Sequence, residues 1–169
     1  MPEVSLRPAA AADRALVERL WLMFHHDLSE FRGGLPDADG TFHGDQPGRV
    51  LTDADWAAYL LVLGTSPAGL VLVRGLTGPT RVLNAFFVVR GARRGGVGLD
   101  AVRQVVARHP GPWEIPFQDA NVAAVHFWRR VAREIAGDAW AEERRAVPHR
   151  PDLPPDVWIS FDTPPAQAS

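Results

Sequence analysis

The chain has 169 residues, of which 46% are hydrophobic, and this size and composition predict one globular domain with a single core. Its net charge of −2 excludes a strong overall field for nucleic acid or an anionic membrane, and no apolar run is long enough to span a bilayer. The sequence contains neither cysteine nor lysine, which excludes disulfides, thiolate metal sites, cysteine and lysine nucleophiles and a lysine-dependent phosphate loop.

The first half of the sequence predicts a strand, a helix, a long loop and a meander of strands. Residues 3–7 alternate like a strand, and apolar residues spaced by four predict a helix from about Asp13 to about Leu28. Gly, Pro and Asp residues predict a long loop at 31–53, with a short helix around 53–59. Three apolar runs with short connections then predict an antiparallel meander with strands at residues 59–63, 69–73 and 82–89.

The second half of the sequence alternates helices and strands. Apolar periodicity predicts a helix at residues 97–108, a strand at 113–117, a helix from Asp119 or Asn121 to about 135, and strands at 140–147 and 156–161. We therefore expect one mixed α/β domain over residues 1–163, followed by a frayed tail at residues 164–169.

A basic, glycine-rich turn, Arg93-Arg94-Gly95-Gly96-Val97-Gly98, separates the last strand of the meander from the helix at 97–108. Glycines allow positive φ angles and let a ligand approach the backbone closely. The first N–H groups of a helix have no partner within the helix, and the helix dipole favours an anion there. Flanking arginines add positive charge and forked donors. The turn therefore predicts a site for a phosphorylated ligand.

The same turn has two other interpretations. Gly96-x-Gly98-x-x-Ala101 fits the dinucleotide-binding fingerprint, and Glu114 lies roughly where that fold has its ribose-binding acid. That fold alternates strands and helices in a parallel sheet, however, whereas here a meander precedes the glycines. A dinucleotide-binding oxidoreductase is therefore a distant alternative, and the other is a turn that only begins a helix.

Two segments resemble motifs of the GNAT acyltransferases. Arg93-x-x-Gly96-x-Gly98, between a strand and a helix, resembles motif A, whose loop amides cradle the pyrophosphate of acetyl-CoA. Asn121-x-x-Ala124-x-x-Phe127-Trp128 resembles motif B, and residues 28–31 and 84–87 resemble a bacterial group of predicted acetyltransferases. The resemblance implies the GNAT fold, in which helices flank a central, mostly antiparallel sheet. It also implies an N-acetyltransferase that uses acetyl-CoA and no metal.

The resemblance further implies which residues contact the cofactor. Main-chain groups near Phe87, Val88 and Val89 would pair with the pantetheine arm, and one of these amides would face the thioester oxygen. The alternative role of Asn121 is that of an ordinary helix cap. The alternative role of Phe127 and Trp128, the aromatic pair of motif B, is core packing. The other implied contacts are Arg93, Arg94, Gly95, Gly96, Val97, Gly98, Asn121, Ala124, Phe127 and Trp128.

Trp128 stands where many family members have a tyrosine that protonates the leaving thiolate. Indole is not a usable acid, but a thiol with a pKa of about 8.5 leaves fairly readily without one. An amine with a pKa of about 10.4 is mostly protonated at pH 7, so a base is the feature to seek. The candidates are Glu30 and His26, which share a helix face, and Glu114, as a half-buried carboxylate with a raised pKa. A solvated helix end and an outward strand residue are their alternative roles.

We expect a small-molecule amine as the acceptor, with a protein amine as the alternative, and neither nucleic acid nor membrane as a partner. A homodimer is an expectation from the family. The opening residues lack a signal-peptide pattern, which together with the absence of cysteine fits a cytoplasmic protein. The family often has a carboxylate on the strand that ends at the cofactor loop, and residues 84–87 contain none. Because this carboxylate and the usual tyrosine are missing, a CoA-binding protein of the same fold with little transferase activity stays open as an alternative.

Overall fold

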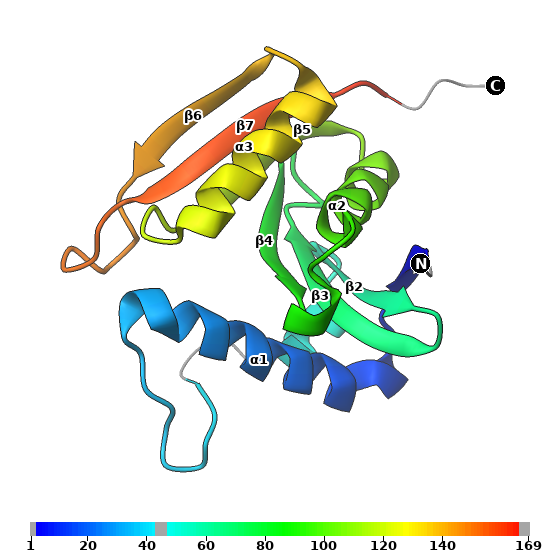
Figure 1. Ribbon diagram of the computed structural model, residues 1–169, viewed down its shortest axis with the longest axis vertical. Coiled ribbons are helices and arrows are strands. Elements are labelled where there is room, and N and C mark those ends of the chain that lie inside the picture. Colours follow the sequence, from blue (N-terminus) through cyan, green and yellow to red (C-terminus); the bar gives the residue numbers. More distant parts are fainter. Residues whose placement is uncertain (1–2, 43–46, 166–169) are drawn as a thin grey trace.

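The structure, a computed structural model, describes residues 3–42 and 47–165. In this part of the chain seven strands form one sheet in the order β1-β2-β3-β4-β5-β7-β6, with three α-helices packed against it (Figure 1). The predicted mixed α/β sheet flanked by helices is confirmed, while residues 166–169 of the predicted tail lie outside the described residues. The strands are β1 (Val4–Pro8), β2 (Trp56–Leu63), β3 (Ser66–Arg74), β4 (Arg81–Val88), β5 (Gly111–Phe117), β6 (Trp140–Arg145) and β7 (Asp156–Thr163).

The helices cover opposite faces of the sheet (Figure 1). α1 (Arg14–Arg32) buries Val17 and Leu20 against β2, β3 and β4, in a cluster that includes Leu70. α2 (Val97–Arg108) and α3 (Val122–Ala136) pack on the other face, over a larger core that includes Val71. Since successive side chains of a strand point to opposite faces, β2 to β4 are buried on both sides and have nearly continuous apolar sequences.

The predicted short helix around residues 53–59 is wrong, because β2 begins at Trp56 and pairs with β3. A 3-10 helix of this loop lies earlier, at Pro47–Leu51. Burial on both faces removes the polar alternation that would have distinguished the start of β2 from a helix. The Asp55 carboxylate fixes this start by accepting the backbone N–H groups of Thr77 (3.0 Å) and Gly75 (3.3 Å).

α1 extends one turn beyond its predicted end. It continues to Arg32 and is closed by Gly33, whose φ of 66° is left-handed. At the other end Asp13 makes no side-chain cap to the helix, because its carboxylate pairs with Arg7 and accepts the N–H of Ala10. The added turn lets Arg32 pair with Asp156 at the start of β7. The end of α1 therefore contacts the part of the sheet that lies beyond β4 in the strand order.

β4 and β5 separate soon after they meet. These strands run parallel and pair only at Arg81 with Trp113 and at Val82 with Glu114. β4 stays paired with β3 on its other edge, with an irregularity at Leu72 and Val73. Figure 1 shows β6 and β7 running away from β4 below this junction. The later part of β4 therefore has one edge without a neighbouring strand.

Candidate functional site

The unpaired edge of β4 presents main-chain groups from alternate residues. The Val89 N–H donates to Ala68 O of β3 at 2.8 Å, so this N–H faces β3, while Val89 O accepts the N–H of Ala92 at 2.9 Å. Peptide groups alternate along a strand, and those of Phe86 and Val88 therefore point to the opposite, unpaired edge. Of the predicted pantetheine contacts, the structure leaves the Val88 N–H at this edge. It turns the main-chain groups of Phe87 and the N–H of Val89 towards β3.

The glycine turn follows directly. A 3-10 helix, η3 (Arg90–Ala92), leads from β4 to Gly95 and Gly96, which both have a φ of 81°. Gly96 is the N-cap of α2 and supplies no side-chain cap, so the first amides of that helix have no partner within it. A Cβ atom at Gly96 would meet nothing within 4 Å, which leaves the surface above the turn open.

Gly98 has a different reason to be glycine. A Cβ atom there would lie 3.1 Å from the ring of Phe127, closer than ordinary van der Waals contact. The second glycine of the motif therefore lets α2 approach α3, while the first gives the turn its left-handed conformation.

The three arginines of this region have different partners. The Arg93 Nε–H donates to Val88 O at 2.8 Å, and its guanidinium pairs with Asp27 of α1. Arg90 pairs with the same carboxylate at 3.1 Å. Arg94 is exposed and has no ion-pair partner among the described residues. Arg94 is therefore the arginine whose guanidinium remains for an anion, whereas Arg93 is engaged within the protein.

The start of α3 lies across from this edge. Asn121 caps the helix, and its Oδ1 accepts the N–H of Ala124 at 3.1 Å. The Phe86 ring stacks on Phe127 with centroids 5.8 Å apart and meets the edge of Trp128 at 5.3 Å. Trp128 is 6% exposed, so it is a core residue, and Phe127 is partly buried against the same core.

His26 and Glu30 are brought together on one face of α1. With Ser29 and Gly33 they follow the spacing of a helix face, and they line a cavity of about 410 Å³ together with Arg90. Both side chains are exposed. Because Arg90 follows β4 by two residues, this cavity adjoins the unpaired end of that strand.

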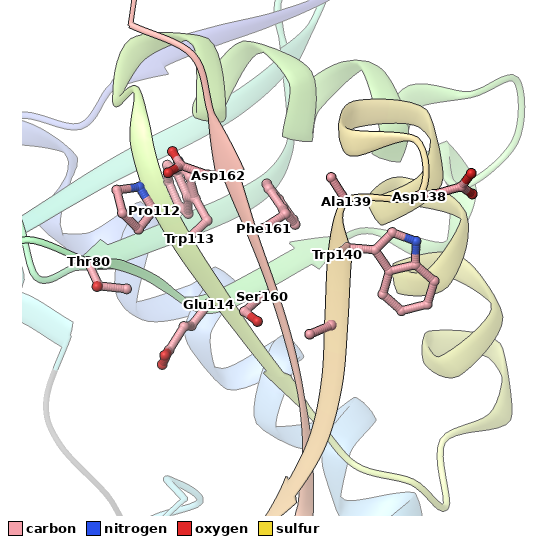
Figure 2. Close-up of a pocket in the computed structure, with 11 residues that line it drawn as sticks. Thr80, Pro112, Trp113, Glu114, Asp138, Ala139, Trp140, Ser160, Phe161 and Asp162 are labelled. Atoms are coloured by element: carbon pink, nitrogen blue, oxygen red, sulfur yellow. The ribbon is translucent and has the colours of Figure 1, made fainter.

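Glu114 does not lie in that cavity. It lines a separate one of about 500 Å³, with Thr80 and Ser160 among its neighbours (Figure 2). Arg145 of β6 donates two hydrogen bonds to its carboxylate, at 2.8 and 3.1 Å, and stacks on Trp158. These hydrogen bonds lower the pKa of Glu114, so the predicted rise in its pKa is wrong. An ionised, paired carboxylate with a low pKa is a poor base at neutral pH.

The partners of two residues in this region carried no sequence signal. Asp27 is 63 and 66 residues away from the arginines that it pairs with. Phe86 joins the aromatic contacts only because β4 separates from β5. In the described ranges, 3–42 and 47–165, no group of three or more His, Asp or Glu side chains could hold a metal ion, and no helix is long and apolar enough to cross a membrane.

Several solved structures with a similar fold are acetyltransferases, although no family model and no curated protein matches this chain. An acetyltransferase from Thermus thermophilus is 19% identical, with a TM-score of 0.65 over 96% of this chain and 99% of that one. A GNAT-family acetyltransferase from Staphylococcus aureus is 14% identical, with a TM-score of 0.66 over 95% and 99%. The aminoglycoside acetyltransferase AAC(6')-Ib, in complex with coenzyme A, is 19% identical, with a TM-score of 0.62 over 95% of each chain. The chain therefore has the fold of the GNAT-family acetyltransferases.

Proposed function

We propose that this protein is a cytoplasmic N-acetyltransferase that moves an acetyl group from acetyl-CoA to a primary amine of a small molecule. The observation that carries the proposal is the unpaired edge of β4. This edge leads into the glycine turn before α2, where the first amides of the helix have no partner within it. An extended, amide-containing arm could pair with this edge like a strand while its phosphates meet the turn. The likeness to an aminoglycoside acetyltransferase supports a small amine as the acceptor.

The residues at the site fit such a cosubstrate. The amides from Gly95 to Gly98 and the guanidinium of Arg94 would hold the pyrophosphate. The N–H of Val88 would pair with the acyl oxygen, and the partly buried ring of Phe127 would flank the thiol end, with the core residue Trp128 packed behind it. In the reaction the amine nitrogen attacks the thioester carbon, the C–S bond breaks, and the thiolate leaves with the electron pair. Positioning of the amine next to the thioester, and hydrogen bonds to the acyl oxygen, would supply most of the rate enhancement.

His26 and Glu30 are the proposed groups for removing the proton of the amine. They line the cavity that adjoins the end of β4, and neither has a hydrogen-bonding side-chain partner in the described part of the chain. Glu114 is withdrawn from this role because it lies in another cavity and because its hydrogen bonds from Arg145 occupy the carboxylate and lower its pKa. Trp128 cannot protonate the thiolate, which at a pKa of about 8.5 leaves without an acid.

The first test is calorimetric titration of the purified protein with acetyl-CoA, CoA and NADH, and then thiol release with a panel of primary amines that includes aminoglycosides. The chain has no cysteine, so released thiol is measured without a protein background, and it has no lysine side chain that could accept the acetyl group. We expect Glu30→Gln or His26→Gln to lower kcat by about 100-fold with an unchanged Kd for acetyl-CoA. Glu18→Gln, an exposed change elsewhere on α1, is the control.

Other results would favour other functions. Binding of acetyl-CoA without thiol release for any amine would favour a CoA-binding protein with little activity. Binding of NADH but no CoA species would favour the dinucleotide alternative.

A further inference from the structure

One carboxylate of α1 holds two arginines that follow β4. Asp27 pairs with both Arg90 and Arg93. The Asp27 and Arg93 side chains are 20% and 43% exposed, against 68% for Arg90. Arg93 also lies 5.8 Å from the centre of the Phe87 ring. The more enclosed of the two ion pairs, Asp27 with Arg93, therefore connects α1 to the end of β4.

Arg93 acts on a peptide group that is held at both ends. Its Nε–H donates to Val88 O at 2.8 Å, while the N–H of the same peptide, from Val89, donates to Ala68 O at 2.8 Å. A peptide group is planar, so two opposed hydrogen bonds fix its orientation. This peptide directly follows the Phe87–Val88 peptide, whose N–H lies at the unpaired edge, so holding it restricts how far the end of β4 can twist and keeps the Val88 N–H in place.

We propose that Asp27 and Arg93 are positioning residues for the acetyl transfer. Asp27 orients the guanidinium of Arg93, Arg93 holds the Val88–Val89 peptide, and the peptide directs the Val88 N–H towards the acyl oxygen. This inference rests on the proposed function. It gives Arg93 a role in orienting the strand, and leaves contact with the pyrophosphate to Arg94 and the amides of the turn.

A contrary role for Arg93 makes the opposite prediction. If Arg93 were a phosphate ligand that Asp27 competes for, then Asp27→Asn would release it and tighten acetyl-CoA binding. If the two residues orient the peptide, Asp27→Asn leaves Kd within about twofold and lowers kcat by about 10- to 100-fold, the size of effect that a small misplacement at a reacting centre causes. The sign of the change in Kd separates the two roles.

The experiment compares Asp27→Asn, Asp27→Glu, Arg93→Gln and Arg94→Gln with the wild type, with Arg103→Gln on α2 as the control. We expect Arg93→Gln to lower kcat as Asp27→Asn does, and the double variant to lose no more than either single one. Asp27→Glu restores a carboxylate and should recover part of kcat. Arg94→Gln should weaken acetyl-CoA binding and keep kcat. Tighter binding in Asp27→Asn, or an unchanged kcat, would overturn the proposal.

Hydrogen exchange tests the bridge from Asp27 through Arg93 to the Val88 carbonyl without an activity assay. In Asp27→Asn, amide exchange of peptides covering residues 84–92 should become faster, while Arg103→Gln should leave it as in the wild type. Unchanged exchange would mean that Asp27 does not hold the end of β4, and would overturn the inference. If exchange accelerates but the wild type neither binds acetyl-CoA nor releases thiol, the bridge stands as an orienting contact and the proposed function fails instead.

Discussion

Replacing Gly96 by alanine isolates the contribution of the glycine turn. Gly96 has a φ of 81° and a ψ of 8°, and a Cβ atom there would meet nothing within 4 Å. The substitution therefore adds backbone strain without a steric clash, and left-handed strain for a residue other than glycine is about 1–2 kcal/mol. In a chain of this size, such a loss lowers Tm by about 2–8 °C.

The same strain predicts the loss of affinity. A turn that relaxes to suit alanine directs its amides away from the phosphates, and binding of acetyl-CoA must then restore the strained form. Strain that the free turn relieves by relaxing is lost from affinity instead of from Tm, so complete relaxation of about 1–2 kcal/mol corresponds to a Kd that is about 5- to 30-fold higher, which calorimetric titration measures directly.

Gly64→Ala is the matched control, because Gly64 also has a positive φ, of 61°, and open space around it, but lies between β2 and β3. It should lower Tm by a similar amount and leave Kd unchanged. A Gly96→Ala protein that is destabilised yet binds acetyl-CoA like the wild type would refute the reasoning.

Three further changes test the roles assigned to single side chains. Glu114→Gln should lower stability at pH 7 by less than about 1 kcal/mol, since its ion pair with Arg145 is partly exposed. Arg145 lowers the pKa of Glu114, so this deficit should be constant above about pH 5, shrink as pH falls through the ordinary carboxyl value of 4.5, and vanish only below the lowered pKa of the folded state; urea unfolding in which the deficit grows as pH falls would contradict this. Asn121→Ala should cost about 0.5–2 kcal/mol in urea unfolding, because α3 loses its cap, and Asn121→Asp should restore the loss. Trp128→Tyr should raise kcat by no more than about threefold, since the thiolate leaves without an acid, and a larger gain in the thiol-release assay would mean that protonation limits the rate.

The glycine turn could be predicted because its signals are local. The end of an apolar run, two arginines, two glycines and the start of an amphipathic helix all lie within one short segment. Chain connectivity alone brings them together, and the structure confirms that α2 begins at Val97. The antiparallel meander was predictable for the same reason, since short connections leave few other ways to pair β2, β3 and β4.

The roles of Glu114 and Arg93 could not be predicted, because they depend on distant partners. Whether Glu114 is a raised-pKa base or a paired anion depends on Arg145, which reaches it from β6 across the intervening strand β7. From the sequence, the position of Arg93 beside the glycines predicts a phosphate contact. In the structure α1 places Asp27 next to Arg93, and the two side chains form an ion pair. A local sequence pattern indicates which roles a side chain could have. Its tertiary contacts determine which of these roles it has in the folded protein.

The separation of β4 from β5 divides the sheet into two sets of strands. β2, β3 and β4 pair in chain order, and the β6–β7 ladder likewise joins strands adjacent in sequence, so much of each set is formed by contacts with a low loop-closure cost. The sets meet through two residue pairs of β4 and β5, through the shared core under α2 and α3, and through the ion pair of Arg32 with Asp156. A ligand in the opening would therefore join two folding units, and its binding energy would appear as added cooperativity between them.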